Sequence, residues 1–251
     1  MKDLVKMGSD AAKAGFKNEK DIIERFNNWK NDNLARQWLK AMGYKIKEIE
    51  CVNAYKVKGS FKADIQVQIH IEIKLKKLQD TQNLQVKLVS NPQGFNQIDK
   101  RWVDKYVELW KIPKDVEKLL KYFTGEVEPY ILNPRDERRM FADEFSVPEQ
   151  QKLVRFISEN KTLIISDILK GRGSFSAEWM LVILKLQDSD LKWTLKPINY
   201  VLNYFGNGEV CITDRGSIKI GKITLQRKGG DGGRKTAQML QFKINPCLLL
   251  E

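Results

Sequence analysis

The feature that most constrains the fold is the segment from Asp64 to Ile73, in which polar and apolar residues alternate without a break. Successive side chains on a β-strand point to opposite faces, so this period of two predicts a half-buried strand. A second apolar run at 84–89 follows a turn-prone stretch through Asp80 and Asn83. We therefore expect the two strands to pair as a hairpin.

Helical and extended patterns surround this pair of strands. Apolar residues at spacings of three and four predict helices at 22–29, 34–42, 98–110, 119–125 and 148–160. Extended patterns predict strands at 179–186, 209–212, 217–226 and 240–244. The chain has 251 residues, which is enough for one large domain or two small ones. We expect one α/β (α+β) body with an added β-rich C-terminal part.

The charge balance indicates the kind of partner and of chemistry. Forty-four Lys and Arg against 32 Asp and Glu give a net charge of +12, which suits nucleic acid or an acidic membrane surface. His70 is the only histidine and the three cysteines form no close pair, which excludes a zinc finger. No apolar run is long enough to span a bilayer, and no apolar stretch follows the basic residues near Met1. We therefore expect a cytoplasmic protein without a secretory signal. An enzyme acting on nucleic acid would then use a metal ion held by carboxylates.

Three residues on the predicted strands have side chains that suit phosphodiester hydrolysis. Asp64 lies on the polar face of the first strand, and Gln85 and Lys87 share a face of the second because they are two residues apart. If the strands are neighbours, a carboxylate, an amide and an ammonium meet on one surface. Asp64, Gln85 and the main-chain carbonyl of Val86 would offer oxygen ligands to Mg2+. Lys87 would orient the attacking water and offset charge on the phosphate.

A further carboxylate is expected from Glu19, on the polar side of the first helix. His70 is expected to be an exposed or edge-strand residue rather than a catalyst. The spacing of Asp64 and the Gln-x-Lys triplet alone also occurs by chance in basic proteins, where a charged strand face is often only solvated.

Longer stretches of the chain match a known family in the same order, from the first helix to the last strand. They are GFKNEKDI, QVKLVSNPQGFNQIDK, RRMF, DILKGRG, FSAEW, RGSI, QRKGGDGGR and MLQFKI. With them the chain resembles the HinPI-type family of type II restriction endonucleases over nearly its whole length. The resemblance implies a PD-(D/E)xK restriction-endonuclease-like core, with a central mixed sheet flanked by helices and a β-rich C-terminal recognition region. It also implies Mg2+-dependent cleavage of double-stranded DNA at a short palindrome, with GCGC as the target.

The matching stretches also carry residue roles to this sequence. They imply that Asp64, Gln85 and Lys87 form the catalytic set, with Gln85 in the usual acidic position as a family feature, and that Glu19 is a supporting metal ligand. The family motif has Ser directly before the Asp, whereas this chain has Ala63. The Ser hydroxyl, a group able to bind metal-bound water, is therefore missing. This concerns how the water around the metal is held, and not the reaction itself.

The segment Gly94-Phe95-Asn96-Gln97 follows the second strand directly. An exposed Phe95 beside Gln97 suits insertion between base steps, with the Gln amide replacing a lost pairing partner. The resemblance supports this interpretation, since the matching Phe and Gln of the family are minor-groove residues. The alternative is that Phe95 starts the hydrophobic stripe of the next helix.

The stretch from Gln226 to Arg234 mixes groups suited to base edges. Arg227, Lys228 and Arg234 can donate to guanine O6 and N7, and Asp231 can accept from the cytosine amine. A target made of G and C needs such a mixture, so we expect this loop to read DNA. The alternative is a hairpin loop whose charges only hold phosphates and carry no sequence information.

Together these features predict a type II site-specific deoxyribonuclease with two Mg2+ ions per site, acting on DNA as a monomer or a two-fold dimer. Residues 1–145 would hold the N-terminal helices and the catalytic core. Residues 146–251 would continue the same body with the recognition region. Two alternatives stay open: a structure-selective or repair nuclease of the same fold, and a non-catalytic DNA-binding protein. A membrane partner is not expected.

Overall fold

The computed structural model describes residues 19–59, 62, 64–73, 76–186, 191–230 and 234–251, and of residues 66–73 and 76–79 the main chain alone. Within these ranges the chain forms two compact units. The first unit contains 19–94, 170–201 and 245–251, and the second unit contains 95–169 and 202–244. Each unit draws on both halves of the chain. The functional division expected near residue 145 stays a prediction.

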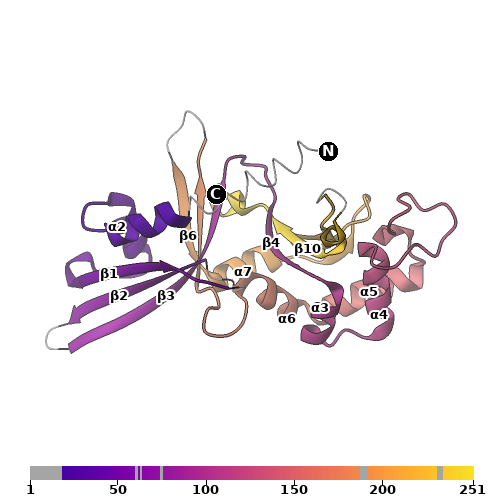
Figure 1. Ribbon diagram of the computed structural model, residues 1–251, viewed down its shortest axis with the longest axis horizontal. Coiled ribbons are helices and arrows are strands. Elements are labelled where there is room, and N and C mark those ends of the chain that lie inside the picture. The colour runs from indigo at the N-terminus through magenta and orange to yellow at the C-terminus, as the bar shows by residue number, and fades with distance from the viewer. Residues whose placement is uncertain (1–18, 60–61, 63, 74–75, 187–190, 231–233) are drawn as a thin grey trace. The chain divides into compact units, whose positions relative to one another are not determined.

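A mixed β-sheet forms the centre of the first unit (Figure 1). Its strands β1, β2, β3, β5 and β6 lie side by side in that order and span Ile49–Lys56, Ile65–Ile73, Lys76–Val89, Trp179–Leu184 and Lys192–Pro197. β3 pairs antiparallel with β2, from Leu84 opposite Ile65 to Lys76 opposite Ile73, so the predicted strands are neighbours. On its other edge β3 pairs in parallel with β5. β3 is therefore hydrogen-bonded on both sides.

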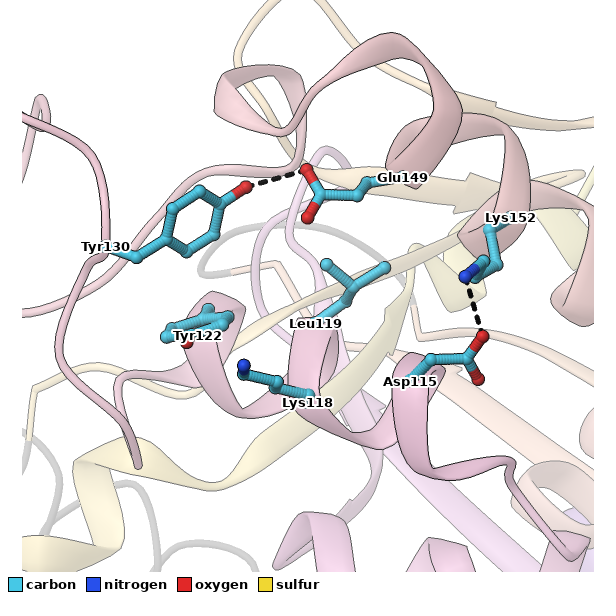
Figure 2. A pocket seen from close by; sticks show the side chains of 7 residues that line it. All are labelled: Asp115, Lys118, Leu119, Tyr122, Tyr130, Glu149 and Lys152. Atoms are coloured by element: carbon cyan, nitrogen blue, oxygen red, sulfur yellow. Dashed lines mark hydrogen bonds and ion pairs between the residues drawn. The ribbon is translucent and has the colours of Figure 1, made fainter.

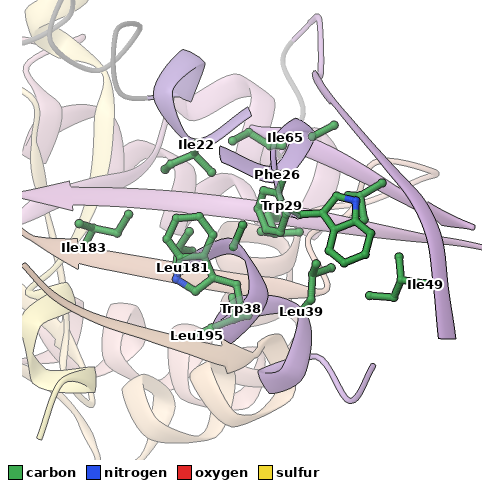
Figure 3. Packing of buried hydrophobic residues seen from close by; sticks show 14 residues of the cluster. Ile22, Phe26, Trp29, Trp38, Leu39, Ile49, Ile65, Leu181, Ile183 and Leu195 are labelled. Carbon is green, nitrogen blue, oxygen red and sulfur yellow. The ribbon is translucent and has the colours of Figure 1, made fainter. Parts of the chain in front are cut away.

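The helix at 19–27 and α2 (Asn33–Ala41) cover one face of this sheet (Figure 3). They pack on each other through Phe26 and Trp38, whose ring centroids are 5.3 Å apart. The sheet contributes alternate residues of its strands to the same buried cluster, namely Ile65, Leu84, Leu181 and Ile183. Because side chains alternate along a strand, Leu84 faces the helices and Gln85 faces the other way.

The second unit combines an antiparallel sheet with helices. The strand order is β4-β10-β9-β8-β7, and the strands span Asn96–Arg101, Leu240–Ile244, Ile223–Arg227, Ile218–Ile220 and Val210–Ile212. The helices are α3 (Val103–Trp110), α4 (Lys114–Thr124), α5 (Val147–Glu159) and α6 (Lys161–Ile165), with a π turn at Ser166–Lys170. α7 (Ile198–Gly206) begins in the first unit and ends in the second. Short 3-10 helices lie at Ile46–Glu48, Ala142–Glu144, Lys235–Gln238 and Pro246–Leu249.

Apolar strand residues of the second unit pack on these helices. Phe242 of β10 lies edge-on to Tyr106 and Trp110 of α3, with centroid distances of 5.6 and 5.8 Å. α5 begins at a capping box, in which the Glu149 carboxylate accepts from the Ser146 main-chain amide at 2.9 Å. In the described residues, no helix combines the length and the apolar character needed to cross a membrane.

The predicted helix at 98–110 is wrong in its first half. Residues 96–101 form β4, and α3 begins only at Val103. The spacing of Ile98 and Trp102 fits a helix, but β4 forms because it pairs with β10 near the other end of the chain, from Leu240 opposite Arg101 to Ile244 opposite Asn96. Such a long-range pairing overrides local spacing.

The predicted turn through Asp80 and Asn83 is also wrong, because both residues lie inside β3. The Asp80 carboxylate accepts hydrogen bonds from the Tyr44 hydroxyl and from the Gln82 amide. The Asn83 side-chain amide donates to the Ser174 carbonyl at 3.0 Å. These bonds satisfy polar groups that would otherwise favour a turn.

The predicted strand at 217–226 is two strands, β8 and β9. Gly221 separates them with a positive φ of 56°. A Cβ at this position would overlap the Asn207 carbonyl oxygen, so the tight turn requires glycine.

The packing of α2 predicts the effect of truncating its buried face. Leu39 is fully buried, and Leu39→Ala should lower the free energy of unfolding by about 2–5 kcal/mol because it leaves a cavity. Lys40 is its exposed neighbour on the helix, and Lys40→Ala should change that free energy by less than about 0.5 kcal/mol. Urea unfolding of both variants measures the difference. Equal midpoints would contradict the assigned packing.

Candidate active site

Asp64 is fixed by a hydrogen bond to the main chain of the neighbouring strand. Its Oδ2 accepts from the Val86 amide at 2.7 Å, and its own amide donates to the Leu84 carbonyl at 2.8 Å. β2 begins only at Ile65, so at this point the carboxylate takes the place of a strand carbonyl. The bond holds Asp64 at the level of Gln85 on β3. It leaves Oδ1 without a hydrogen bond to any residue described here.

Gln85 has a buried oxygen that nothing in the described residues satisfies. The residue is only 3% exposed, and its side-chain Oε1 has no hydrogen-bond partner among them. Its neighbour on β5 is Met180, which is fully buried and apolar, so this neighbour offers no hydrogen-bond donor to the amide oxygen. An unpaired buried carbonyl oxygen costs about 1–3 kcal/mol. Such an atom calls for an explanation, and an ion is one.

Lys87 lies two residues further along β3 and shares the face of Gln85. It is half-buried, and no ion pair or hydrogen bond joins its ammonium to the part of the chain that the structure describes. Leu84, Val86 and Leu88 take the other face and pack in the core below the helices. The strand thus separates the polar groups from the core, as its period of two predicts.

Glu19 is placed differently from the other predicted ligands. Its Oε2 lies 2.7 Å from the ammonium of Lys56 on β1. Lys56 pairs with Ile65 through the main chain, one residue from Asp64. The ion partner of Glu19 is thus Lys56, and the metal-binding role of Glu19 stays a prediction.

The donors brought together here suit a hard cation. No three His, Cys, Asp or Glu residues among those described form a metal-binding group, and the second acidic position of the motif is held by Gln85. Asp64 and Gln85 nevertheless supply oxygen atoms, the ligands that Mg2+ prefers. The side chain of His70 and the whole of Ala63 lie outside the described residues.

Comparison with known proteins decides the family. The model of the R.HinP1I restriction endonuclease family matches residues 42–250. The chain belongs to this family. It is therefore a type II restriction enzyme that hydrolyses DNA. No curated protein matches it.

Among solved structures, the chain is similar to restriction endonuclease MspI, which was crystallised in complex with its cognate DNA. The TM-score is 0.63 with 16% identity, over 90% of this chain and 87% of that chain. At this identity the similarity concerns the fold. It confirms the predicted restriction-endonuclease-like fold, with a mixed sheet flanked by helices.

In this member of the R.HinP1I family, Phe95 and Gln97 lie at the start of β4. Phe95 is 56% exposed and precedes a strand, so the alternative that it begins a helical stripe is wrong. Gln97 is exposed, and its Oε1 accepts a 2.8 Å hydrogen bond from Gln241 of β10. Insertion of Phe95 into DNA stays a prediction.

A buried charge network holds β4 in place behind these two residues. Arg101 donates to Asp167 at 2.7 Å and lies 3.3 Å from Asp99. The Tyr106 hydroxyl donates to Asp99 at 2.6 Å and the Trp110 indole donates to Asp167 at 3.0 Å. Burial and the Asp99 carboxylate raise the pKa of Tyr106. Each of these groups is hydrogen-bonded. Removing one side chain would leave the charge of its partner buried and unpaired, which costs a large part of the stability.

Two polar residues on β10, Gln241 and Lys243, were not expected from the sequence to have a role. Gln241 is 5% exposed, and its Oε1 has no partner among the described residues. Lys243 is half-buried, and this burial lowers its pKa. Their signal was the alternation in Leu-Gln-Phe-Lys-Ile, which places both on the face opposite Phe242.

The predicted reading loop is only partly described. Gln226 and Arg227 lie at the end of β9, and Lys228 follows directly. Arg234 is exposed on the far side of the loop. Asp231 lies outside the described residues. Base reading by this loop stays a prediction.

A pocket of about 390 Å³ lies between α4 and α5 (Figure 2). Both of its carboxylates are paired: Lys152 lies 2.7 Å from Asp115, and the Tyr130 hydroxyl donates to Glu149 at 2.7 Å. The other residues that line it are Lys118, Leu119 and Tyr122. The acids of this pocket therefore already have partners.

The bond between Asp64 and Val86 predicts a stability difference between two substitutions. Asp64→Ala removes the acceptor of a partly buried amide and should lower the free energy of unfolding by about 1–3 kcal/mol. Asp64→Asn keeps an oxygen acceptor and should lower it by less than about 1 kcal/mol. Chemical unfolding in the presence of a chelator measures both. Equal losses would mean that the bond does not hold the strands together.

Proposed function

We propose that this enzyme is a Mg2+-dependent endonuclease that cleaves double-stranded DNA at a short palindrome, with GCGC as its target. The observation that carries the proposal is the buried, unpaired Oε1 of Gln85 at the level of the Asp64 carboxylate. A carboxylate oxygen and an unsatisfied carbonyl oxygen on one strand face support a cation site. A surface that only grips phosphates would not need that oxygen.

The residues fit such an ion by the chemistry of their donors. Asp64 through Oδ1, Gln85 through Oε1 and the Val86 main-chain carbonyl would hold Mg2+, with Glu19 as a supporting ligand and two ions per site. The ion would neutralise charge on the phosphate and lower the pKa of a water molecule. Since Gln85 is neutral, the site carries less negative charge than one with two acids at these positions.

The protein's own groups position the reaction. Lys87 would orient the attacking water and donate to phosphate oxygens, for which its ammonium has no competing ion pair among the described residues. The bond from the Val86 amide keeps the Asp64 carboxylate on the same strand face. Water would attack phosphorus opposite the 3′-oxygen, which leaves 5′-phosphate and 3′-hydroxyl ends.

Recognition would use the second unit. Phe95 would insert between base steps, with Gln97 as a pairing substitute, because an exposed aromatic side chain at a fixed strand end suits a wedge. Gln226 at the end of β9 would meet the duplex together with Lys228, Asp231 and Arg234 of the loop that follows. Crystallisation of MspI with its cognate DNA supports double-stranded DNA as the partner. A monomer and a two-fold dimer both suit a palindrome.

Digestion of plasmid DNA with Mg2+, followed by sequencing of the ends, tests the target. We expect discrete fragments whose ends map to GCGC. Ends at another palindrome would contradict GCGC but not the endonuclease activity. Cleavage confined to branched or mismatched DNA would favour a structure-selective nuclease. Duplex binding without cleavage under any divalent metal would favour a non-catalytic DNA-binding protein.

Gln85→Met tests whether the unpaired oxygen is kept for a metal. Met has a similar volume and no oxygen, so without metal the variant should match the wild type or exceed its free energy of unfolding by about 1 kcal/mol. Mg2+ should raise the Tm of the wild type more than that of the variant, because it binds only the intact site. Cleavage should be lost.

The matched control for this substitution is Asn83→Leu on the same strand. The Asn83 amide is buried but bonded to the Ser174 carbonyl, so its loss should lower the free energy of unfolding by about 1–3 kcal/mol. If Gln85→Met destabilised the protein as much as Asn83→Leu, the Gln85 oxygen would be part of the fold and not of a metal site.

A further inference from the structure

The end of β9 and the segment before α5 form a pocket of about 420 Å³ in the second unit. We call it the arginine pocket, after the basic residues that line it with one acid: Asp136, Arg138, Arg139, Arg227, Arg234 and Lys235. Two of these arginines, Arg138 and Arg139, begin the stretch RRMF, for which the sequence indicates no particular role.

Positive charge in the arginine pocket exceeds its counter-charge. Arg138 donates to both carboxylate oxygens of Asp136, at 2.8 and 3.0 Å. Arg139 and Arg227 reach the same carboxylate at 3.7 and 3.9 Å. Three guanidiniums thus share a single carboxylate. Arg234, on the rim, forms no ion pair with any residue that the structure describes.

Two of the guanidiniums are also withdrawn from water. The side chains of Arg139 and Arg227 are 17% and 10% exposed. Burial, together with repulsion from Arg227 and Arg138, holds the pKa of Arg139 below its usual range. Burial and repulsion from Arg138 do the same to the pKa of Arg227. A bound anion would relieve both penalties.

The guanidiniums are held in place before any ligand binds. Arg139 stacks on the Phe141 ring at 3.9 Å, and Arg227 donates through Nε to the Ala237 carbonyl at 3.1 Å. The main chain of Arg138 packs directly against Gly125, where a Cβ would overlap the Arg138 carbonyl oxygen. A prearranged site loses less entropy on binding.

We propose that the arginine pocket binds a phosphodiester group of the DNA backbone, so that Arg227 holds a phosphate and does not read a guanine. The proposal rests on DNA as the substrate of the proposed function. Guanidinium forks match phosphate oxygens in pairs. The lining glycines Gly229 and Gly230 have open space where a Cβ would lie, so a polymer can approach the main chain closely.

The test measures duplex binding without metal, in an Asp64→Asn background that does not cut. The probes are one duplex with GCGC and one with the same bases scrambled. Arg139→Gln should weaken binding of both duplexes roughly tenfold and leave their affinity ratio unchanged. The slope of log affinity against log salt should become shallower by about 0.9, the value for one phosphate.

Arg155→Gln is the matched control. Arg155 is exposed on α5 and pairs only with Glu159 among the residues described, so its substitution removes the same charge outside the pocket. Both affinities and the salt slope should stay close to those of the background. If the control lost as much as Arg139→Gln, general charge attraction would explain binding and the proposal would be overturned.

A second variant guards against misfolding. Arg139→Gln removes a buried stacked group, whereas Arg138 is 75% exposed, so Arg138→Gln leaves the packing intact. Arg138→Gln should also weaken the binding of both duplexes by the same factor. A loss confined to the GCGC duplex in either variant would make the pocket a base reader. Unchanged affinity for both duplexes in a folded variant would show that the pocket does not bind DNA. Either result overturns the proposal.

Inorganic phosphate separates the DNA backbone from a free phosphate ligand. The contrary outcome is that phosphate raises the Tm of the Asp64→Asn protein above its value in chloride of equal ionic strength, but does not raise the Tm of the same protein with Arg139→Gln. With unchanged duplex affinity, this would assign the pocket to a free ligand and overturn the proposal. Absence of duplex binding by the Asp64→Asn protein itself would instead refute the proposed function.

Discussion

The pairing of β3 on both of its edges is the constraint on which the site depends. An antiparallel ladder to β2 and a parallel ladder to β5 fix the register of the strand. A slip by one residue would turn Leu84 out of the core and bury Lys87 under the helices. The hydrophobic cluster that stabilises the first unit therefore also decides which side chains share a face with Asp64.

The sequence predicted this relation because it needs only local periodicity and one assumption. Alternation fixes the faces of both strands, and the assumption that they are neighbours brings Asp64 to Gln85. The parallel partner of β3 could not be predicted, since Gln85 and Met180 meet only through a crossover of many residues. The same limit explains β4, where the spacing of Ile98 suggested a helix and pairing with β10 produced a strand. Local pattern fails where a distant strand supplies the hydrogen bonds.

Among the described residues, the two proposed sites differ in the ligand charge that suits them. The buried oxygen of Gln85 lacks a donor, so a cation suits it. The guanidiniums of Arg139 and Arg227 share the Asp136 carboxylate with Arg138, so a further anion suits them. The Arg101 guanidinium, by contrast, is paired with Asp167. Local rules tend to be broken at functional sites, which is why these exceptions carry more information than the satisfied network.

If Arg227 binds a phosphate of the DNA backbone, as proposed, other residues must recognise the bases. On β10, Gln241 lies opposite Gln226 and Lys243 lies opposite Gln97, so amides and an ammonium share one polar face of the second sheet. Strand residues hold their side chains more firmly than loop residues do, and discrimination between bases depends on such placement. Phosphate contacts fix the position of a duplex but carry no sequence information. If the arginine pocket supplies affinity in this way, specificity would come from the loop after β9 together with the polar sheet face, on which Gln97 is exposed.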